Sequence, residues 1–281
     1  MNKRIIRHMP PVEYIPFLIL FLLFYVFPLI HSVIFVAGAD NVTGFSFSNL
    51  IQSSKSVLTN PFFLLGLKNN LEISLVQTGT TIVLGIIISL ALWMSSKAIM
   101  YLKWLILPAL IPTACIVILW TSFQRMASGN SLLSFLGIQG SLLDRMGLYS
   151  LFLWRYLGLA ASIFTFAIYQ QPYSVFEAAR LDGATTMQLL RYIILPLMAP
   201  VIAGVTIFLF SLSLRVFRES WLMYGEYPSE RLYSTMNYMH NHFRKLNYQS
   251  VATASVLFTL IITLITVFFM SLVKIGRRLH V

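Results

Sequence analysis

Long apolar stretches alternate with shorter polar ones along the whole chain. Each apolar run reaches the length of about 20 residues that a helix needs to cross the hydrocarbon core of a bilayer. The runs lie at roughly residues 15–39, 71–94, 101–122, 149–170, 192–213 and 250–273. The pattern therefore predicts an all-α polytopic membrane protein, with six transmembrane helices in a single domain that covers residues 1–281.

Composition agrees with this prediction and excludes other classes of protein. Hydrophobic residues make up 58% of the chain and charged residues 10%, whereas a soluble domain carries about 25% charged residues. The single Cys115 excludes a disulfide framework within the chain. The net charge of +11 is carried in short tails and loops between the apolar runs. That distribution fits membrane orientation better than a nucleic-acid-binding face, so no nucleic-acid partner is expected.

The basic residues also predict the orientation. Lys3, Arg4 and Arg7 precede the first run, which favours a cytoplasmic N-terminus. Six spans then return the C-terminus to the cytoplasm. External loops are expected at residues 40–67, 123–148 and 214–249, and a cytoplasmic loop at residues 172–191.

Two runs carry features that qualify this topology. Ala37-Gly38-Ala39 resembles a signal-peptidase site, but the first run is longer than the apolar core of a signal peptide. An uncleaved first helix is the interpretation, and a cleaved signal is the alternative. Pro108 and Pro112 interrupt the third run, where the missing amide and the ring clash predict a kink.

Residues that catalyse reactions or bind nucleotides form no recognisable site. His240 and His242 share an external loop, but no third ligand stands at a spacing that completes a metal site. A glycine-rich phosphate loop of the G-x-x-x-x-G-K type does not occur in the sequence. We therefore expect a chain that is not an enzyme and binds no metal or cofactor itself. Any energy for work must reach it from another protein.

The cytoplasmic stretch 172–191 is more ordered than a passive connector. Phe176, Ala179 and Gly183 recur near helical spacing. Pro172 is suited to the start of a helix, and Gly183 to its end. These signals predict a short helix, a turn and a second helix on the cytoplasmic surface. A helix that only rests on lipid is the alternative at this point.

The residues of this stretch carry a specific resemblance. Glu177-Ala178-Ala179-x-x-Asp182-Gly183-Ala184, followed by Ile193-Ile194-Leu195-Pro196 and Pro200, closely resembles the EAA loop of permease subunits in bacterial binding-protein-dependent ATP-binding-cassette (ABC) importers. The likeness extends over nearly the whole chain and is greatest to the first, maltose and oligosaccharide type of permease in the carbohydrate branch. The family's Gly-Gly-Pro after the fifth span is replaced here by Gly225-Glu226-Tyr227-Pro228.

The resemblance implies a fold, a location and a set of partners. The fold would be that of a type I importer permease, located in the bacterial plasma (inner) membrane as a multi-pass protein. A second permease subunit would complete a heterodimer in the membrane lipid. Two cytoplasmic ATPase subunits would hold the ATP and magnesium, and an extracytoplasmic solute-binding protein would deliver the substrate. The function implied is import of a carbohydrate, expected to be an oligosaccharide, by alternating access.

The same resemblance implies roles for particular residues. Contacts that couple the chain to an ATPase are expected at Glu177, Ala178, Ala179, Asp182 and Gly183. In the substrate path the expected residues are Trp154, Tyr156, Ser211, Ser213 and Arg215. Trp154 and Tyr156 have an equally good interpretation as aromatic residues of the membrane interface. For Arg215 the alternatives are snorkelling to the head groups and binding of an anionic sugar.

Other functions compete with oligosaccharide import. Within the family, glycerol phosphate or another polyol derivative is the nearest rival substrate. A membrane-embedded enzyme would need paired acids and bases inside the spans, where Glu72, Arg155 and Arg215 are the ionisable residues at hand. A passive channel would leave the patterned loop at 172–191 unexplained.

Overall fold

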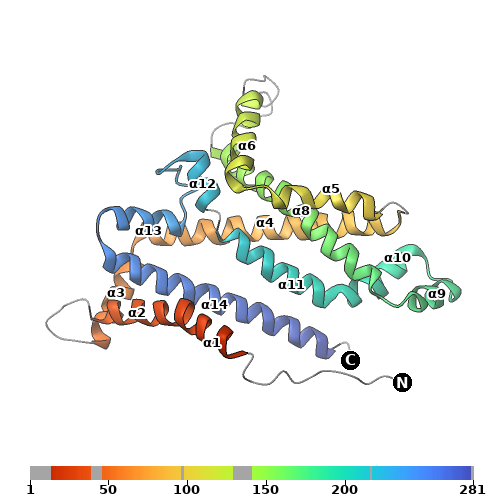
Figure 1. Ribbon diagram of the computed structural model, residues 1–281, viewed down its shortest axis with the longest axis horizontal. Helices are drawn as coiled ribbons and strands as arrows, with labels where there is room; N and C mark the ends of the chain where they lie inside the picture. Colours follow the sequence, from red (N-terminus) through yellow and green to blue (C-terminus); the bar gives the residue numbers. More distant parts are fainter. Residues whose placement is uncertain (1–13, 39–45, 96–97, 129–140, 216, 280–281) are drawn as a thin grey trace. The chain divides into compact units, whose positions relative to one another are not determined.

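The chain is almost entirely helical in the computed structural model, which describes residues 14–38, 46–95, 98–128, 141–215 and 217–279. The all-α fold class is thus confirmed. The helices (Figure 1) are α1 Ile15–Phe21, the π-helical turn η2 Leu22–Val26, α2 Phe27–Ala37, α3 Phe47–Leu58, α4 Pro61–Trp93, α5 Ala98–Leu110, α6 Thr113–Ser128, α8 Ser141–Tyr169, α9 Tyr173–Leu181, α10 Thr186–Leu189, the π-helical turn η3 Leu190–Ile194, α11 Leu195–Ser213, α12 Phe217–Tyr224, α13 Thr235–Arg244 and α14 Tyr248–Leu279.

Several predictions fall wholly or partly outside the described residues. Residues 1–13 and 280–281, which include the expected cytoplasmic ends, are among them, and so are parts of the expected loops 40–67 and 123–148. In the described part of 40–67 the chain is largely helical, because it forms α3 and the first turns of α4. The expected loop 214–249 contains α12 and α13.

The described residues contain five candidate membrane spans, or six by a broader count, against six apolar runs in the sequence. Within the described ranges, five helical stretches are long and apolar enough to cross a bilayer: Ile15–Ala37, Pro61–Trp93, Arg145–Tyr169, Thr186–Tyr224 and Tyr248–Ser271. A sixth results if Met100–Leu110 and Thr113–Ser122 count as one span with a bend of 94°. The bend lies at residues 111–112, beside Pro108, where the sequence predicts a kink.

The described residues divide into two compact units. One takes in residues 1–64 and 238–262, and the other residues 65–237 and 263–281, so α4 and α14 contribute to both. In the first unit, α1 buries no residue and α2 buries only Val36 and Ala37. Its helices therefore keep much apolar surface, as a chain in lipid or against another subunit requires.

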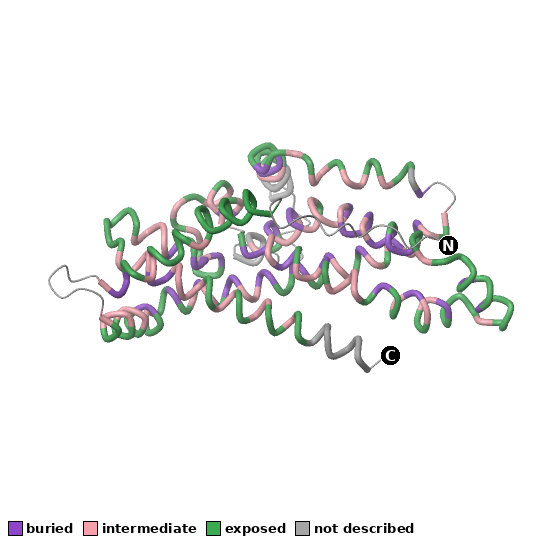
Figure 2. Tube along the Cα trace, turned by 60° about the horizontal axis from the view of Figure 1, so that its bottom comes forward, coloured by how far each residue is buried: buried purple, intermediate pink, exposed green. Residues whose placement is uncertain are grey.

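The second unit contains the larger core and the candidate sites. Helix α5 packs so closely on α8 that a Cβ added at Gly158 would collide with the carbonyl group of Leu105, the small-residue packing expected between membrane helices. In Figure 2 the buried positions are short purple segments that alternate with pink and green ones along the helices. Helices of the second unit such as α9 and α11 therefore bury some positions and leave others exposed.

Candidate functional site

The predicted turn after α9 has a well-defined geometry. Helix α9 begins directly after Pro172 and ends before Asp182. Gly183 has φ +79°, the left-handed conformation that glycine adopts without strain. The amide of Gly183 donates to the carbonyl of Arg180 (3.1 Å), and the amide of Ala184 donates to that of Ala179 (3.0 Å). These two bonds form a Schellman motif, so Gly183 ends the helix by the route that the sequence predicts.

The second short helix is capped by a signal that our sequence analysis did not use. The amide of Gln188 donates to the Thr185 hydroxyl, and the Gln188 side-chain oxygen accepts from the Thr185 amide at 2.8 Å. This reciprocal pair is a capping box, and its T-x-x-Q spacing can be read from the sequence. The turn between α9 and α10 is thus fixed at both ends.

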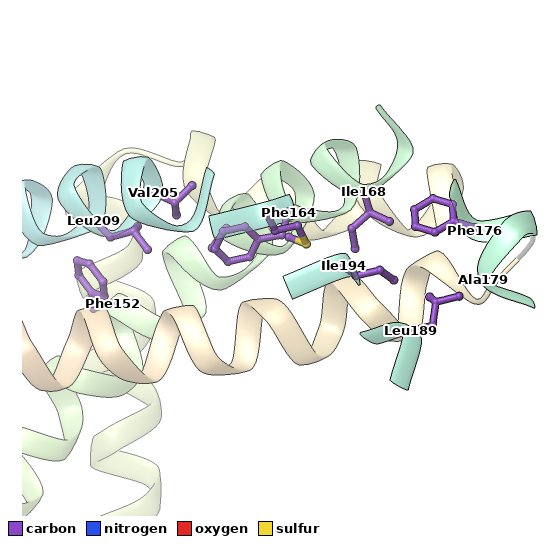
Figure 3. Close-up of a cluster of buried hydrophobic side chains, with 11 residues drawn as sticks. Phe152, Phe164, Ile168, Phe176, Ala179, Leu189, Ile194, Val205 and Leu209 are labelled. Atoms are coloured by element: carbon purple, nitrogen blue, oxygen red, sulfur yellow. The ribbon is translucent and has the colours of Figure 1, made fainter. Parts of the chain in front are cut away.

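The inner side of this helical pair packs into the core of the second unit. Phe176 and Ala179 of α9 and Leu189 of α10 are buried at 3%, 8% and 3% exposure. They belong to one cluster with residues of α8, η3 and α11, among them Ile168 of α8 and Ile194 of η3 (Figure 3). The ring of Phe176 also contacts that of Trp93 at the end of α4, with centroids 5.5 Å apart. Helix α9 therefore packs against several long helices at once.

The outer side carries the other predicted coupling residues. Glu177, Ala178, Asp182 and Gly183 are all exposed, whereas Ala179 is buried and holds α9 in place from within. Leu181 projects beside them with 89% of its surface exposed. Our sequence analysis missed Leu181, because neither apolar periodicity nor the motif assigns it a role. A single exposed apolar side chain is common on protein surfaces, so this exposure alone gives Leu181 no role.

A second cluster lies near the middle of α8 and centres on a charged pair. Arg155 Nη1 stands 3.6 Å from a carboxylate oxygen of Glu219 in α12, and the two side chains are 13% and 17% exposed. The same Nη1 donates to the hydroxyl of Thr113 in α6 at 2.7 Å. Arg155 thereby ties α6 and α12 to α8. Sequence analysis named Arg155 but could not supply Glu219 as its partner.

The predicted substrate-path residues do not gather in one place. Tyr156 lines a cavity of about 10 Å³ together with Arg155, Glu219 and Gln77, a volume near that of a single water site. Trp154 is 41% exposed and its ring lies 6.5 Å from that of Trp120. These two aromatic residues thus occupy different surroundings.

The remaining three path residues lie at the end of α11 and beyond it. The hydroxyls of Ser211 and Ser213 donate to the helix's own carbonyls, those of Ile207 and Phe210, at 2.8 Å each. Ser213 is buried at 1% exposure, and Arg215 is exposed. Among the residues that the structure describes, only Tyr156 of the five predicted positions lines the cavity beside Arg155.

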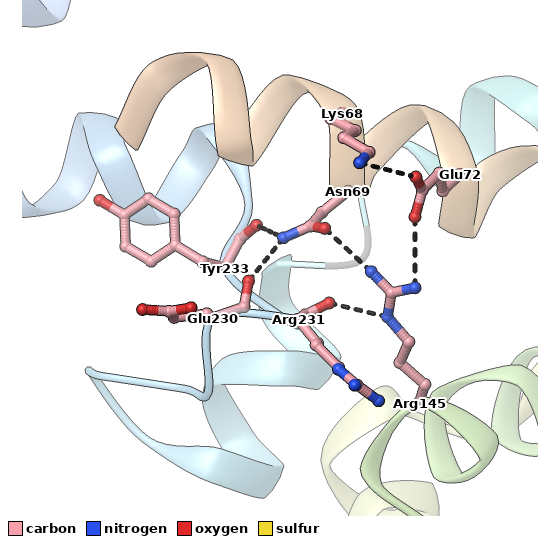
Figure 4. Close-up of polar contacts among 7 residues, drawn as sticks. All are labelled: Lys68, Asn69, Glu72, Arg145, Glu230, Arg231 and Tyr233. Carbon is pink, nitrogen blue, oxygen red and sulfur yellow. Dashed lines mark hydrogen bonds and ion pairs between the residues drawn. The ribbon is translucent and has the colours of Figure 1, made fainter. Parts of the chain in front are cut away.

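A polar network holds the segment before α13 against the start of α4 (Figure 4). The Asn69 amide donates to the carbonyls of Glu230 and Tyr233 at 2.7 and 2.9 Å. Arg145 of α8 donates to the Asn69 side-chain oxygen at 2.9 Å and contacts Glu72 at 3.2 Å. Asn69 is 3% exposed, so these bonds satisfy a buried amide. The network fixes the position of the segment that follows the altered Gly225-Glu226-Tyr227-Pro228 stretch.

Neither cluster resembles a catalytic or metal centre. Throughout the described ranges, no group of three or more His, Cys, Asp or Glu side chains is placed to hold a metal ion. The loop α9–α10 is exposed on one side and packed into the core on the other. The Arg155 cluster and the Asn69 network are side-chain contacts that connect helices.

Comparisons with known proteins relate the chain to membrane permeases. No protein-family model matches it. It is 29% identical over 227 residues to the arabinooligosaccharides transport system permease protein AraP of Bacillus subtilis, with 74% of this chain and 70% of that protein covered. It is also 26% identical over 281 residues to a probable ABC transporter permease protein of Pyrococcus horikoshii, with 92% and 96% covered.

Solved structures agree on the fold. The chain matches a bacterial ABC transporter involved in the import of the acidic polysaccharide alginate, with a TM-score of 0.76, 20% identity and 94% of both chains covered. A second match is to the bacterial alginate ABC transporter in complex with an alginate pentasaccharide-bound periplasmic protein, with a TM-score of 0.74, 20% identity and 92% and 91% covered. At this identity the likeness defines the fold of the chain and not its substrate.

Proposed function

We propose that this chain, a multi-pass membrane protein related to the permease subunits of carbohydrate ABC importers, moves a neutral oligosaccharide into the cytoplasm by alternating access. The observation that carries the proposal is the loop α9–α10. It exposes Glu177, Ala178, Asp182 and Gly183 on a turn held by a Schellman motif and a capping box. The chain itself is not an enzyme, as befits a permease subunit.

The loop suits the input of work from an ATPase. Its outer side offers a carboxylate at Glu177, which can pair with a basic group of a partner, and the exposed apolar side chain of Leu181, which a partner can cover. Its inner side packs into the core of the second unit through Phe176 and Leu189. A push on the outer side therefore moves the packed helices behind it rather than the loop alone.

The proposed assembly supplies what the chain lacks. Two cytoplasmic ATPase subunits would bind ATP and magnesium, and each would contact one permease. A second, related permease subunit would complete the path, and an extracytoplasmic binding protein would deliver the sugar. The exposed apolar surface of α1 and α2 supports a place in lipid or against such a subunit.

Charge pairing at Arg155 favours a neutral substrate over an anionic one at that position. Arg155, the cation nearest to the small cavity, already faces the carboxylate of Glu219 at 3.6 Å. A phosphate or uronate would have to displace Glu219 from a largely buried pair. Glycerol phosphate is thus the less favoured alternative. The naming of two relatives, from Bacillus subtilis and Halalkalibacterium halodurans, for arabinooligosaccharide transport supports the same choice.

Reconstituted transport tests the proposal. The chain is co-purified with its partner permease and ATPases, placed in proteoliposomes with the binding protein outside, and supplied with radiolabelled arabinotriose. We expect uptake that needs ATP and the binding protein, and none with an ATPase that binds but does not hydrolyse ATP. Flux without ATP would make the chain a passive channel, and uptake of glycerol phosphate but not of the sugar would favour the alternative substrate.

A further inference from the structure

A cleft in the first unit has a lining unlike that of the rest of the chain. It measures about 310 Å³ and lies between α3 and the first turns of α14, a volume at the lower end of the range for small-molecule sites. Apart from Val57, the lining residues carry amide or hydroxyl groups, and none is charged. A site of this composition is suited to a ligand that is neutral and rich in hydrogen-bonding groups.

One wall of the cleft is a regular stripe on α3. Asn49, Gln52, Ser53 and Ser56 follow one another at intervals of three, one and three residues. These positions share one face of a helix. Within the described part of the chain, the side chains of Asn49, Gln52 and Ser56 have no hydrogen-bond partner, so their amide and hydroxyl groups are available to a ligand.

The opposite wall is held in place by hydrogen bonds. The Gln249 amide nitrogen donates to the hydroxyl of Ser53 at 3.0 Å and to the carbonyl of Val36 at 3.2 Å. The Thr253 hydroxyl donates to the Gln249 carbonyl at 2.8 Å, and Thr253 is 1% exposed. Because the α14 wall is already held in place by these hydrogen bonds, a ligand that binds to the α3 stripe orders few further side chains. The entropy cost of binding is reduced accordingly.

We infer that this cleft is a binding site for a neutral saccharide, separate from the substrate path. Amide and hydroxyl side chains both donate and accept, as does each hydroxyl of a sugar, so neighbouring sugar hydroxyls find matching partners along the α3 stripe. A charged ligand would meet no counter-charge in the lining. The choice of sugar rests on the proposed function, because a chain expected to import an oligosaccharide would meet it on the outer side of the membrane, where the loop 40–67 is expected to lie.

A segment of another protein is the main competing occupant. Protein interfaces are usually anchored by aromatic or arginine side chains in apolar pockets. The lining offers a single aliphatic residue, Val57, so it lacks such a pocket. A concave, polar and uncharged surface favours the sugar.

Titration of sugars onto the importer tests the site. The full-length chain, with its partner permease and ATPases but without the binding protein, is placed in lipid nanodiscs and titrated with arabinotriose by saturation-transfer NMR. We expect Asn49→Ala/Gln52→Ala to weaken binding about tenfold or more, which corresponds to two lost neutral hydrogen bonds. Lys55→Ala, on the same helix but outside the lining, should leave the affinity unchanged. Trigalacturonate, an acidic sugar of equal length, should bind about tenfold more weakly than arabinotriose or worse.

Contrary results are distinct from failure of the proposed function. Equal affinity in the double variant and the parent chain, or tighter binding of trigalacturonate, would overturn the site. Loss of binding-protein docking in the double variant, with an unchanged arabinotriose titration, would assign the cleft to a protein segment instead. If ATP-driven uptake occurs while the double variant titrates like the parent, the proposed function stands and the cleft assignment falls. If arabinotriose binds in the cleft but is never taken up, the cleft assignment stands and the proposed function falls.

Discussion

The ring of Trp93, the last residue of α4, packs against the ring of Phe176 in α9, with centroids 5.5 Å apart and planes inclined by 55°. Trp93 ends one of the longest apolar helices of the chain, and Phe176 is 3% exposed within the predicted coupling loop. The contact connects the exposed loop with the interior of the second unit. It gives the proposed coupling a physical path, because force applied to α9 reaches α4 through two rigid rings.

Removing the Phe176 ring should uncouple the loop from the core. Truncation of a buried phenylalanine leaves a cavity and costs about 3–5 kcal/mol. For Phe176→Ala we expect a clearly lower Tm of the purified chain, and ATP hydrolysis by the assembled importer that no longer drives uptake. Tm is followed by thermal unfolding in detergent, and the ratio of sugar imported to ATP hydrolysed is measured in proteoliposomes.

Tyr173→Ala provides the control on the same helix. Tyr173 is 63% exposed, so its truncation leaves no cavity, and both Tm and the transport ratio should stay near those of the parent chain. If Phe176→Ala retains the parent ratio of sugar to ATP, work does not pass through this contact.

Gly183 should tolerate asparagine but not valine. Its φ of +79° costs a residue with a side chain roughly 1–2 kcal/mol, and asparagine is the residue that best accepts this conformation after glycine. We expect Gly183→Val to abolish uptake while the protein still reaches the membrane, and Gly183→Asn to keep most of it. Membrane content is measured by immunoblot and uptake with labelled sugar.

The same experiment separates backbone strain from crowding. A Cβ at Gly183 meets no atom within 4 Å, so a clash with the rest of the chain cannot explain a defect. Gly204 in α11 also has open space around it but lies inside a regular helix, and Gly204→Ala should transport normally. Equal uptake by Gly183→Val and the parent would show that the turn is not needed for coupling.

The loop was predictable because its signals are local. Pro172 and Gly183 mark the ends of α9 in the sequence itself, and the Thr185–Gln188 capping box was equally readable. The apolar runs are local too, since each needs only its own length to identify it. The buried side of α9 was indicated in part by the helical spacing of Phe176 and Ala179, both of which are buried. The almost full exposure of Leu181 was not predictable, because it depends on where α8 and α11 lie.

Contacts between distant residues account for most of what the sequence did not reveal. Arg155 was visible as an unusual charge in an apolar run, but Glu219 lies in a different helix, and only the tertiary fold brings the two together. Ser211 and Ser213 were chosen by their position relative to the family. In the structure both hydroxyls donate to backbone carbonyls of α11. Sequence periodicity alone does not reveal these hydrogen bonds.

The Arg155–Glu219 pair should behave as a unit. Removal of one partner of a buried pair leaves an uncompensated charge and costs about 3–5 kcal/mol, whereas replacement of both by apolar residues is often neutral. We expect Arg155→Met to lower Tm strongly and Arg155→Met/Glu219→Leu to recover most of the loss. A double-mutant cycle of thermal unfolding measures the coupling. Additive effects of the two substitutions would mean that the side chains do not interact in the folded protein.

Gly66 of α4 is expected to tolerate no side chain, because another segment approaches its backbone. A Cβ at this position would lie 2.7 Å from the carbonyl carbon of Ser234 and from the amide nitrogen of Thr235. These are backbone atoms and cannot rotate away. Asn69, one helical turn further on, holds the same segment by its bonds to the carbonyls of Glu230 and Tyr233. For Gly66→Ala we expect a loss of about 1–3 kcal/mol, the range for overpacking, seen as a lower Tm.

Gly79 supplies the matched comparison on the same helix. A Cβ there meets nothing within 4 Å, and alanine is favoured over glycine inside a helix by about 1 kcal/mol. Gly79→Ala should therefore leave Tm equal or raise it, while Gly66→Ala lowers it. Limited proteolysis should cut the segment between α12 and α13 faster in Gly66→Ala than in Gly79→Ala, because the added methyl group disrupts the packing of this segment against α4. If both variants unfold at the same temperature and are cut at the same rate, the segment is not held against α4 as the Asn69 bonds and the Gly66 contact require.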